Sequence, residues 1–116
     1  MKRAKLNGWL SLFLLFVGAT LNVQAQTWSF SASMHYWHTS HTATLLNNGE
    51  VLVAAGGGIG NAYQNYSELY NPSTGPFSDT GSLNTASCYP KATLLNNGMV
   101  LVVNGTNWEL YDPSTG

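Results

Sequence analysis

The segment ATLLNNGEVLV at residues 43–53 recurs as ATLLNNGMVLV at residues 92–102, identical at ten of eleven positions with an offset of 49 residues. A second pair, ELYNPSTG at residues 68–75 and ELYDPSTG at residues 109–116, matches at seven of eight positions with an offset of 41. Chance does not produce two such matches in 116 residues. The chain therefore contains an internal repeat, whose unit falls within the range of about 20–50 residues found in repeat proteins.

Each repeat begins with a predicted β-hairpin. Residues 42–46 are compatible with a strand, the turn sequence NNG favours positive φ at Gly49, and residues 51–55 form the return strand. The copy of this turn ends at Gly98. Consecutive apolar residues in both strands indicate that both faces of the hairpin are buried.

Two further strands complete the unit. Residues 67–70 form the third strand, which ends at the turn sequence NPSTG, and residues 77–83 form the fourth. Residues 28–34 align with residues 77–83 at the offset of 49, with Met34 on Leu83, and predict a leading strand. Four antiparallel strands covered on both faces are typical of a β-propeller blade. The predicted fold class is therefore all-β.

The run HTATLLNNGEVLVAAGG at residues 41–57, followed by SELYNPSTG at residues 67–75, resembles the bacterial kelch repeat. That repeat also occurs in the propeller domain of galactose-oxidase-like proteins. The resemblance covers nearly all of residues 27–116 and implies a kelch-type propeller of four-stranded antiparallel blades. The second repeat departs from the first in carrying Ser87 where the first has His38.

The resemblance divides the chain into parts. Residues 26–41 hold the leading strand and the connection to the first blade, residues 42–83 form the first kelch-like blade, and residues 84–116 form a truncated second blade. Because closed propellers have roughly four to eight blades, these incomplete blades indicate a fragment of a longer parent protein. In that parent the leading strand would complete the last blade. The isolated fragment leaves strand edges and apolar faces uncovered, which predicts self-association.

Residues 1–25 have the pattern of a secretory signal peptide, with a basic start, an apolar stretch and the small residues Val23 and Ala25 before the predicted cleavage site. An uncleaved membrane anchor is the alternative. A spanning helix needs roughly 20 apolar residues, and glycine and polar residues dilute the stretch beyond Val17. The expected location is therefore secreted, periplasmic or at the cell envelope, with no stable membrane span after cleavage.

Charge and cysteine content exclude several classes of protein. Only 8% of the residues are charged, and after residue 25 a single lysine, Lys91, stands against five acids. A nucleic-acid-binding protein needs a basic surface, so that class is excluded. One cysteine, Cys88, excludes an internal disulfide framework and a zinc site built on paired cysteines.

Aromatic residues in the connections are the candidate ligand-facing residues. The connection at residues 35–41 and the loop at residues 55–66 are expected on the same rim, because alternating strands return to the same side of a blade. Aromatic side chains with amide neighbours suit a sugar or peptide ligand. The four candidates are Tyr36, Trp37, Tyr63 and Tyr66.

Three histidines, His35, His38 and His41, lie at spacings of three and are candidates for Cu or Zn binding. On a strand that spacing alternates faces, so structural or exposed roles are favoured. Galactose-oxidase-like enzymes use copper held by Tyr and His together with a Cys–Tyr cross-link. That cross-link joins residues distant in sequence, so Cys88 beside Tyr89 is interpreted as a buried small residue next to a loop aromatic.

The predicted function is that of an exported kelch-repeat module that binds a protein or a glycan and has no enzymatic activity of its own. No catalytic residue, metal or cofactor is predicted. The alternative is an N-terminal piece of a secreted galactose-oxidase-like carbohydrate oxidase. Three aromatic residues, Trp28, Phe77 and Trp108, are predicted to pack between blades.

Overall fold

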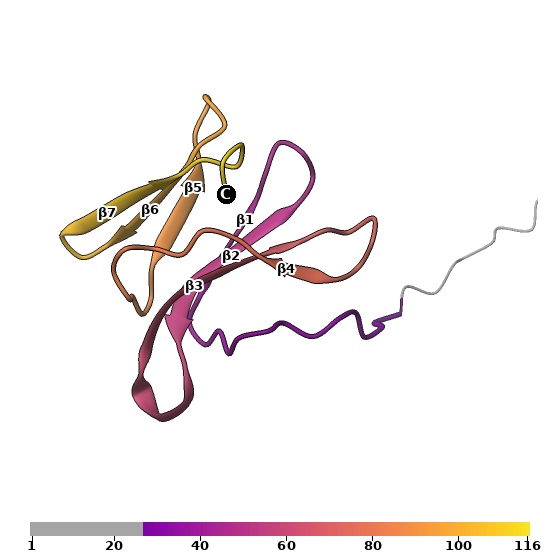
Figure 1. Cartoon of the computed structure of the whole chain (residues 1–116), viewed down its shortest axis with the longest axis horizontal. Helices are drawn as coiled ribbons and strands as arrows, with labels where there is room; N and C mark the ends of the chain where they lie inside the picture. The colour runs from indigo at the N-terminus through magenta and orange to yellow at the C-terminus, as the bar shows by residue number, and fades with distance from the viewer. Residues whose placement is uncertain (1–26) are drawn as a thin grey trace, which may run out of the picture.

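The computed structural model describes residues 27–116, so the predicted signal peptide at residues 1–25 lies outside the described residues. Two antiparallel sheets make up this part of the chain (Figure 1). The first has the strand order β1-β2-β3-β4 and the second the order β5-β6-β7. The predicted all-β fold class is confirmed. Among the described residues, no helix has the length and apolar character needed to cross a membrane.

The first sheet contains the strands of the first repeat. They are β1 (Thr42–Leu45), β2 (Val51–Gly57), β3 (Tyr63–Tyr70) and β4 (Phe77–Asp79), with a short 3-10 turn, η1 (Ile59–Asn61), between β2 and β3. The loop predicted at residues 55–66 is therefore much shorter, because β2 and β3 remain paired as far as Gly57 and Tyr63. The predicted fourth strand is also shorter than expected, since its regular pairing with β3 ends at Asp79.

The second sheet contains β5 (Lys91–Leu94), β6 (Val100–Asn104) and β7 (Asn107–Tyr111). Its central pairing has the register of the first sheet: Val51 lies opposite Tyr70, and Val100 opposite Tyr111. The two repeats differ at the other end of this pairing, where β6 turns directly into β7 after Asn104. The difference in length between the repeats is thus confined to one end of the hairpin.

The predicted turn geometry of the first hairpin is confirmed in both repeats. Gly49 and Gly98 both have φ of 87°. The Gly49 N–H donates to the Leu46 carbonyl at 3.0 Å, and the Gly98 N–H donates to the Leu95 carbonyl at 2.9 Å. Because non-glycine residues rarely adopt this conformation, the repeated glycine fixes the same turn twice.

A bulge interrupts the pairing of β2 with β3: Ala54 pairs with Ser67 and Gly56 with Gln64, so the extra residue lies in β3. On the β2 side of this bulge, Ala55 and Gly56 have φ of 56° and 109°. A Cβ atom on Gly56 would lie 2.5 Å from the Thr39 carbonyl oxygen, so only glycine fits here. The Gly56 N–H donates to the Ser87 carbonyl at 2.8 Å. The bulge therefore joins the connection before β1, the strand β2 and the start of the second repeat.

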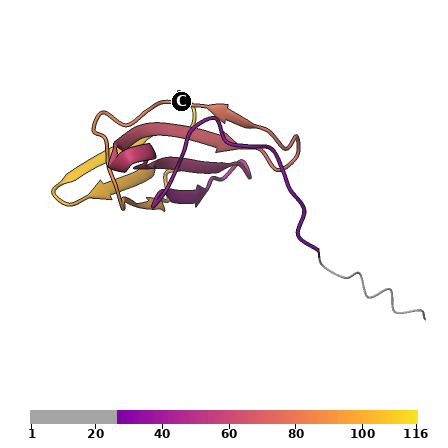
Figure 2. The ribbon, with the colours of Figure 1, turned by 90° about the horizontal axis from the view of Figure 1, so that it is seen from below.

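The hydrophobic core lies between the two sheets, which Figure 2 shows from below. Its buried members are Leu46, Leu52, Ala54, Val100 and Val102. Leu52 and Val100 are 1% and 0% exposed. Burial of one such side chain contributes about 1.5–3 kcal/mol, so the sheets stabilise each other mainly through these residues.

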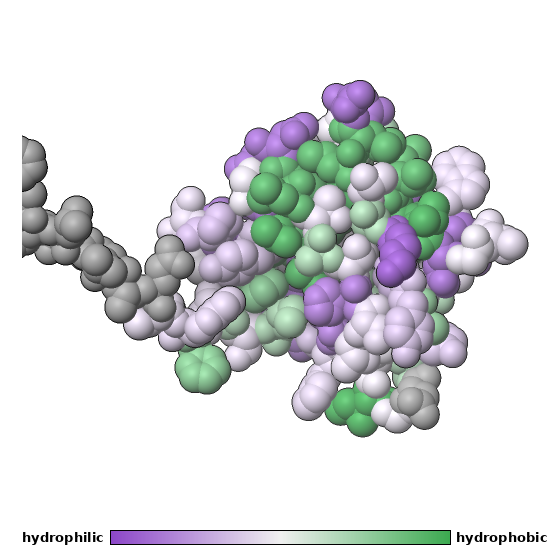
Figure 3. Space-filling view, turned by 180° about the vertical axis from the view of Figure 1, so that it is seen from behind, coloured by the Kyte–Doolittle hydropathy of each residue, from purple (hydrophilic) through white to green (hydrophobic). Residues whose placement is uncertain are grey.

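Several predictions about packing are wrong. Residues 28–34 form no strand, because in the described part of the chain no neighbouring strand pairs with them. Trp28 is 104% exposed and Trp108 is 67% exposed, so neither packs between sheets. Leu45 is 64% exposed, which leaves one face of β1 uncovered. Figure 3 shows hydrophobic side chains gathered at the surface on one side of the molecule.

Candidate functional site

The carboxylate of Glu68 holds the connection at residues 35–41 against the first sheet. Glu68 lies in β3 and is fully buried. Its Oε1 accepts a hydrogen bond from the His35 backbone N–H at 2.8 Å, and its Oε2 accepts one from the Tyr36 backbone N–H at 3.3 Å. Both donors are main-chain groups, so the connection is fixed in position whatever side chains it carries.

The buried side chain of His38 is the side-chain hydrogen-bond partner of Glu68. His38 Nδ1 lies 2.8 Å from the Ala55 carbonyl oxygen, and Nε2 lies 3.1 Å from Glu68 Oε2. A carbonyl oxygen only accepts hydrogen bonds, so Nδ1 carries a proton and donates it. A second proton must then lie between Nε2 and Oε2. This arrangement neutralises a carboxylate that is removed from water.

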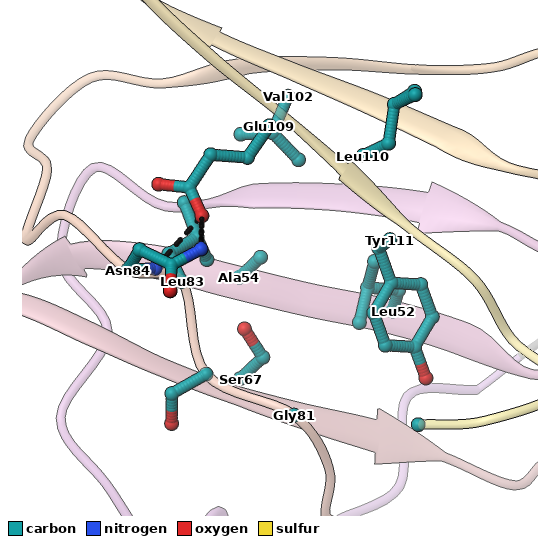
Figure 4. A pocket seen from close by; sticks show the side chains of 12 residues that line it. Leu52, Ala54, Ser67, Gly81, Leu83, Asn84, Val102, Glu109, Leu110 and Tyr111 are labelled. Atoms are coloured by element: carbon teal, nitrogen blue, oxygen red, sulfur yellow. Dashed lines mark hydrogen bonds between the residues drawn. The ribbon is translucent and has the colours of Figure 1, made fainter.

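Glu109 has the equivalent position in the second repeat. Its Oε2 accepts the backbone N–H and the side-chain N–H of Asn84 at 2.7 and 2.8 Å (Figure 4). Its Oε1 accepts the Thr85 N–H at 3.1 Å. Asn84 and Thr85 follow His35 and Tyr36 by 49 residues, so the same two backbone donors are used in both repeats. The carboxylate borders a cavity of about 110 Å³ between the sheets.

An exposed ion pair lies beside Glu68. His35 Nδ1 is 2.6 Å from Asp79 Oδ1, and both side chains are about half exposed. The hydrogen bond with Asp79 raises the pKa of His35 above its ordinary value of 6.5; desolvation opposes this shift, and the negative charges of Asp79 and Glu68 add to it. The pair ties the connection to β4.

Two of the four predicted ligand-facing aromatics come together here. Tyr36 stacks on Tyr66 with ring centroids 4.3 Å apart and planes at 15°. The Tyr36 hydroxyl donates to Asp79 Oδ2 at 3.4 Å, and the negative charge of Asp79 is the main cause that raises the pKa of Tyr36. Next to Tyr36, Trp37 is 65% exposed and lines an open hollow of about 430 Å³ formed by the connection.

The fourth predicted aromatic, Tyr63, is separated from the others. It lies three residues before Tyr66 on β3, in the stretch that contains the bulge. Tyr63 lines a different hollow, which also contains Cys88 and Tyr89. A hydrogen bond with Cys88 raises the pKa of Tyr63. Cys88 is half-buried rather than buried, and Tyr89 is exposed, as expected for a loop aromatic.

The three histidines are not gathered into one ligand set. His38 uses both ring nitrogens in buried hydrogen bonds, and His41 Nδ1 donates to the His38 carbonyl at 2.6 Å. Sequence reasoning missed another trio, His35, Glu68 and Asp79, whose possible ligand atoms lie within 4.8 Å of one another. In this structure the three side chains form a cluster in which His35 Nδ1 donates a hydrogen bond to Asp79 Oδ1.

Comparison of the chain with protein-family models and with curated proteins finds no match.

Proposed function

We propose that the chain is an exported module of kelch-like repeats that binds a glycan through the surface formed by Tyr36, Trp37 and Tyr66 beside Asp79. The observation that supports this proposal is the stack of Tyr36 on Tyr66, with the Tyr36 hydroxyl bonded to Asp79. Aromatic faces and a carboxylate thereby meet at one exposed place. Aromatic faces pack on the apolar faces of sugar rings, and carboxylates accept hydrogen bonds from their hydroxyls.

The repeated sheets support the kelch-like part of the proposal. Each sheet begins with the same hairpin, and the first strands of the two sheets, β1 and β5, contact each other. Core residues from both sheets pack together, with Leu52 of β2 and Val100 of β6 almost fully buried. Sheets stacked face to face about a common line of first strands are what adjacent propeller blades require.

The carbohydrate-oxidase alternative would need histidine ligands for copper. The copper of galactose-oxidase-like enzymes needs unprotonated histidine nitrogens. His38 has both nitrogens engaged, and the Nδ1 atoms of His35 and His41 act as donors to oxygen. His38 is therefore unsuited to hold copper, whereas His35 and His41 donate through Nδ1 and keep Nε2 as the ring nitrogen that copper would use. We derive no oxidation step.

Binding of the full chain to a panel of immobilised oligosaccharides tests the proposal. Tyr66→Ala and Trp37→Ala should each weaken binding to a positive oligosaccharide by about tenfold, the loss expected for about 1.4 kcal/mol of contact. Tyr63→Ala is the matched control, because it removes an exposed tyrosine from the same strand that lines a different hollow. Binding should be unchanged in that variant.

Absence of binding to every oligosaccharide by the folded chain would contradict the glycan proposal, and retention on a peptide library would then favour a protein ligand. Equal losses in the Tyr66→Ala and Tyr63→Ala variants would place the site elsewhere. Export is tested separately: N-terminal sequencing of exported material should begin at Gln26, and retention of Met1 would contradict the predicted signal peptide.

A further inference from the structure

Three side chains from different parts of the first repeat converge beside the connection at residues 35–41. His35 lies in this connection, Glu68 in β3 and Asp79 at the end of β4. His35 Nδ1 is 2.6 Å from Asp79 Oδ1 and 3.6 Å from Glu68 Oε1. One such atom from each residue lies within 4.8 Å of the other two. An imidazole nitrogen and two carboxylate oxygens therefore meet at one place, which solvent reaches because His35 and Asp79 are about half exposed.

The second repeat shows what a purely structural residue does at the position of His35. Asn84 is the equivalent residue, and its side-chain N–H donates to Glu109 Oε2 at 2.8 Å. His35 Nδ1 instead lies 3.6 Å from Glu68 Oε1, beyond hydrogen-bond distance. Among the described residues, that oxygen accepts only the His35 backbone N–H, although a carboxylate oxygen has two lone pairs. A fully buried carboxylate therefore keeps an unused acceptor position beside an imidazole.

The other oxygen of each carboxylate is held by the protein. Glu68 Oε2 lies 3.1 Å from His38 Nε2 and accepts the Tyr36 backbone N–H at 3.3 Å. Asp79 Oδ2 accepts the Tyr36 hydroxyl at 3.4 Å. Carboxylates that bind metals are in turn hydrogen-bonded to outer groups, which orient them toward the ion. Each of the two carboxylates thus has one oxygen fixed by the protein and one oxygen that belongs to the cluster.

We propose that His35 Nδ1, Glu68 Oε1 and Asp79 Oδ1 bind a zinc ion. Zinc is bound by imidazole nitrogens and carboxylate oxygens at about 2.0–2.2 Å, and three protein ligands with one water complete its tetrahedron. Two atoms on the same ion are then at most about 4.4 Å apart. The distances of 2.6 and 3.6 Å from His35 Nδ1 fall within this limit. Small rotations of the half-exposed His35 and Asp79 side chains place the three atoms around one ion, while the buried Glu68 stays fixed.

Zinc takes the place of a proton in this cluster. The Nδ1 proton between His35 and Asp79 leaves to solvent, and the ring of the zinc-bound form keeps one proton on Nε2, because a metal binds neutral imidazole. The Tyr36 hydroxyl bonds to Asp79 Oδ2, so the ion and the aromatic surface use different oxygens of this carboxylate. Zinc binding therefore does not depend on glycan binding, and the two are measured separately.

Calorimetric titration of the full chain with zinc chloride tests the site. The wild-type chain should bind one zinc ion per molecule. His35→Asn and Asp79→Asn should each weaken binding by about a hundredfold or more, because each removes a ligand, and loss of an outer hydrogen-bond partner alone costs about 10–100-fold. Both side chains are half exposed, so their replacement is compatible with a folded chain.

Two further variants are matched controls. His41→Asn removes an exposed histidine from the same connection, whose Nδ1 is bonded to the His38 carbonyl. Cys88→Ser removes a thiol, another group that binds zinc, from the hollow that Tyr63 lines. Both variants should bind zinc as the wild type does. Equal losses in His35→Asn and His41→Asn, or absence of binding by the wild type, would overturn the proposal.

Nitrogen NMR of labelled histidines identifies the ligand atom in the wild-type chain, so this measurement does not depend on the folding of a variant. Zinc should shift the Nδ1 signal of His35 more than any other histidine nitrogen. Zinc should also raise the urea midpoint of the wild type, because an ion that binds only the folded state stabilises it, and should leave that of His35→Asn unchanged. A main shift at His35 Nε2 or at His41, or equal stabilisation of both chains, would refute the site.

Discussion

Glu68 in the first repeat and Glu109 in the second accept hydrogen bonds from backbone N–H groups at equivalent positions, yet the two carboxylates have different surroundings. Glu68 is fully buried and is hydrogen-bonded to His38 Nε2. Glu109 is half-buried and receives the side-chain amide of Asn84 in place of an imidazole. The position of His38 is occupied by Ser87, whose buried hydroxyl has no hydrogen-bond partner in the described part of the chain.

This difference separates two roles of the repeated glutamate: positioning the connection and having its charge neutralised. The backbone hydrogen bonds of the glutamate position the connection between units, and both repeats keep them. The means of neutralising the charge changes with burial, because a carboxylate that retains contact with water needs no ion partner. The first repeat therefore depends more strongly on its glutamate than the second repeat does.

The largest expected effect comes from removing the two charges separately. Glu68→Gln should lower the free energy of unfolding by about 3 kcal/mol, because it leaves His38 without its carboxylate and turns an amide N–H toward backbone donors. Glu109→Gln should cost about 1 kcal/mol, since Glu109 is partly hydrated. Urea titrations of both variants at one low protein concentration measure the difference. Equal losses would show that burial does not distinguish the two sites.

The bulge glycine gives the second contrast. Gly56→Ala should destabilise the protein by about 2 kcal/mol or more, because the residue has positive φ and the new Cβ would meet the Thr39 carbonyl. Gly105→Ala should cost about 1 kcal/mol, since its φ is also positive but no atom lies within 4 Å of the new Cβ. Hydrogen exchange of the Thr39 amide should accelerate only in the Gly56 variant. Acceleration in both variants would contradict the role of the bulge.

The smallest expected effect is a pH dependence that only the first repeat has. Because the pKa of His35 is raised in the folded state, its contribution to stability is complete below the ordinary value of 6.5 and is lost as pH rises through the folded pKa. The equivalent residue, Asn84, does not titrate. His35→Asn should therefore remove this loss of stability between about pH 6 and pH 8. Urea midpoints across this range measure it, and an unchanged pH profile in the variant would exclude His35 as the source.

The features of the fold that depend on residues adjacent in the sequence could be predicted. The turns at Gly49 and Gly98 follow from local turn chemistry, and both were predicted with the correct sign of φ. The strand at residues 28–34 was wrong, because local pattern cannot supply the neighbouring strand that a β-strand requires. The extension of β3 back to Tyr63 was missed, since the bulge at Gly56 allows the pairing to continue through an apparent loop.

The hydrogen bonds around Glu68 could not be predicted from local pattern. Acidic residues are usually exposed, and the backbone donors of Glu68 lie 33 and 32 residues earlier in the chain. The available signal was that glutamate stands before Leu-Tyr in both repeats, whereas the acidic Asp112 has the uncharged Asn71 as its counterpart. The negative charge is kept at the glutamate position and not at the position three residues later, which indicates that the glutamate makes a structural contact. The stacking of Tyr36 on Tyr66 also depends on this contact, because Glu68 fixes the backbone of Tyr36.

The shared register of the two central hairpins has a consequence for protein engineering. The two pairings begin in the same way, with Val51 opposite Tyr70 and Val100 opposite Tyr111. The extra residues of the first repeat all lie at the opposite end of the pairing, around the turn between β2 and β3. The first repeat thus accommodates an insertion that leaves the core side of the hairpin unchanged. The tight turn after Asn104 is accordingly the position at which a foreign peptide could be grafted for display, with both ends of the graft carried by paired strands.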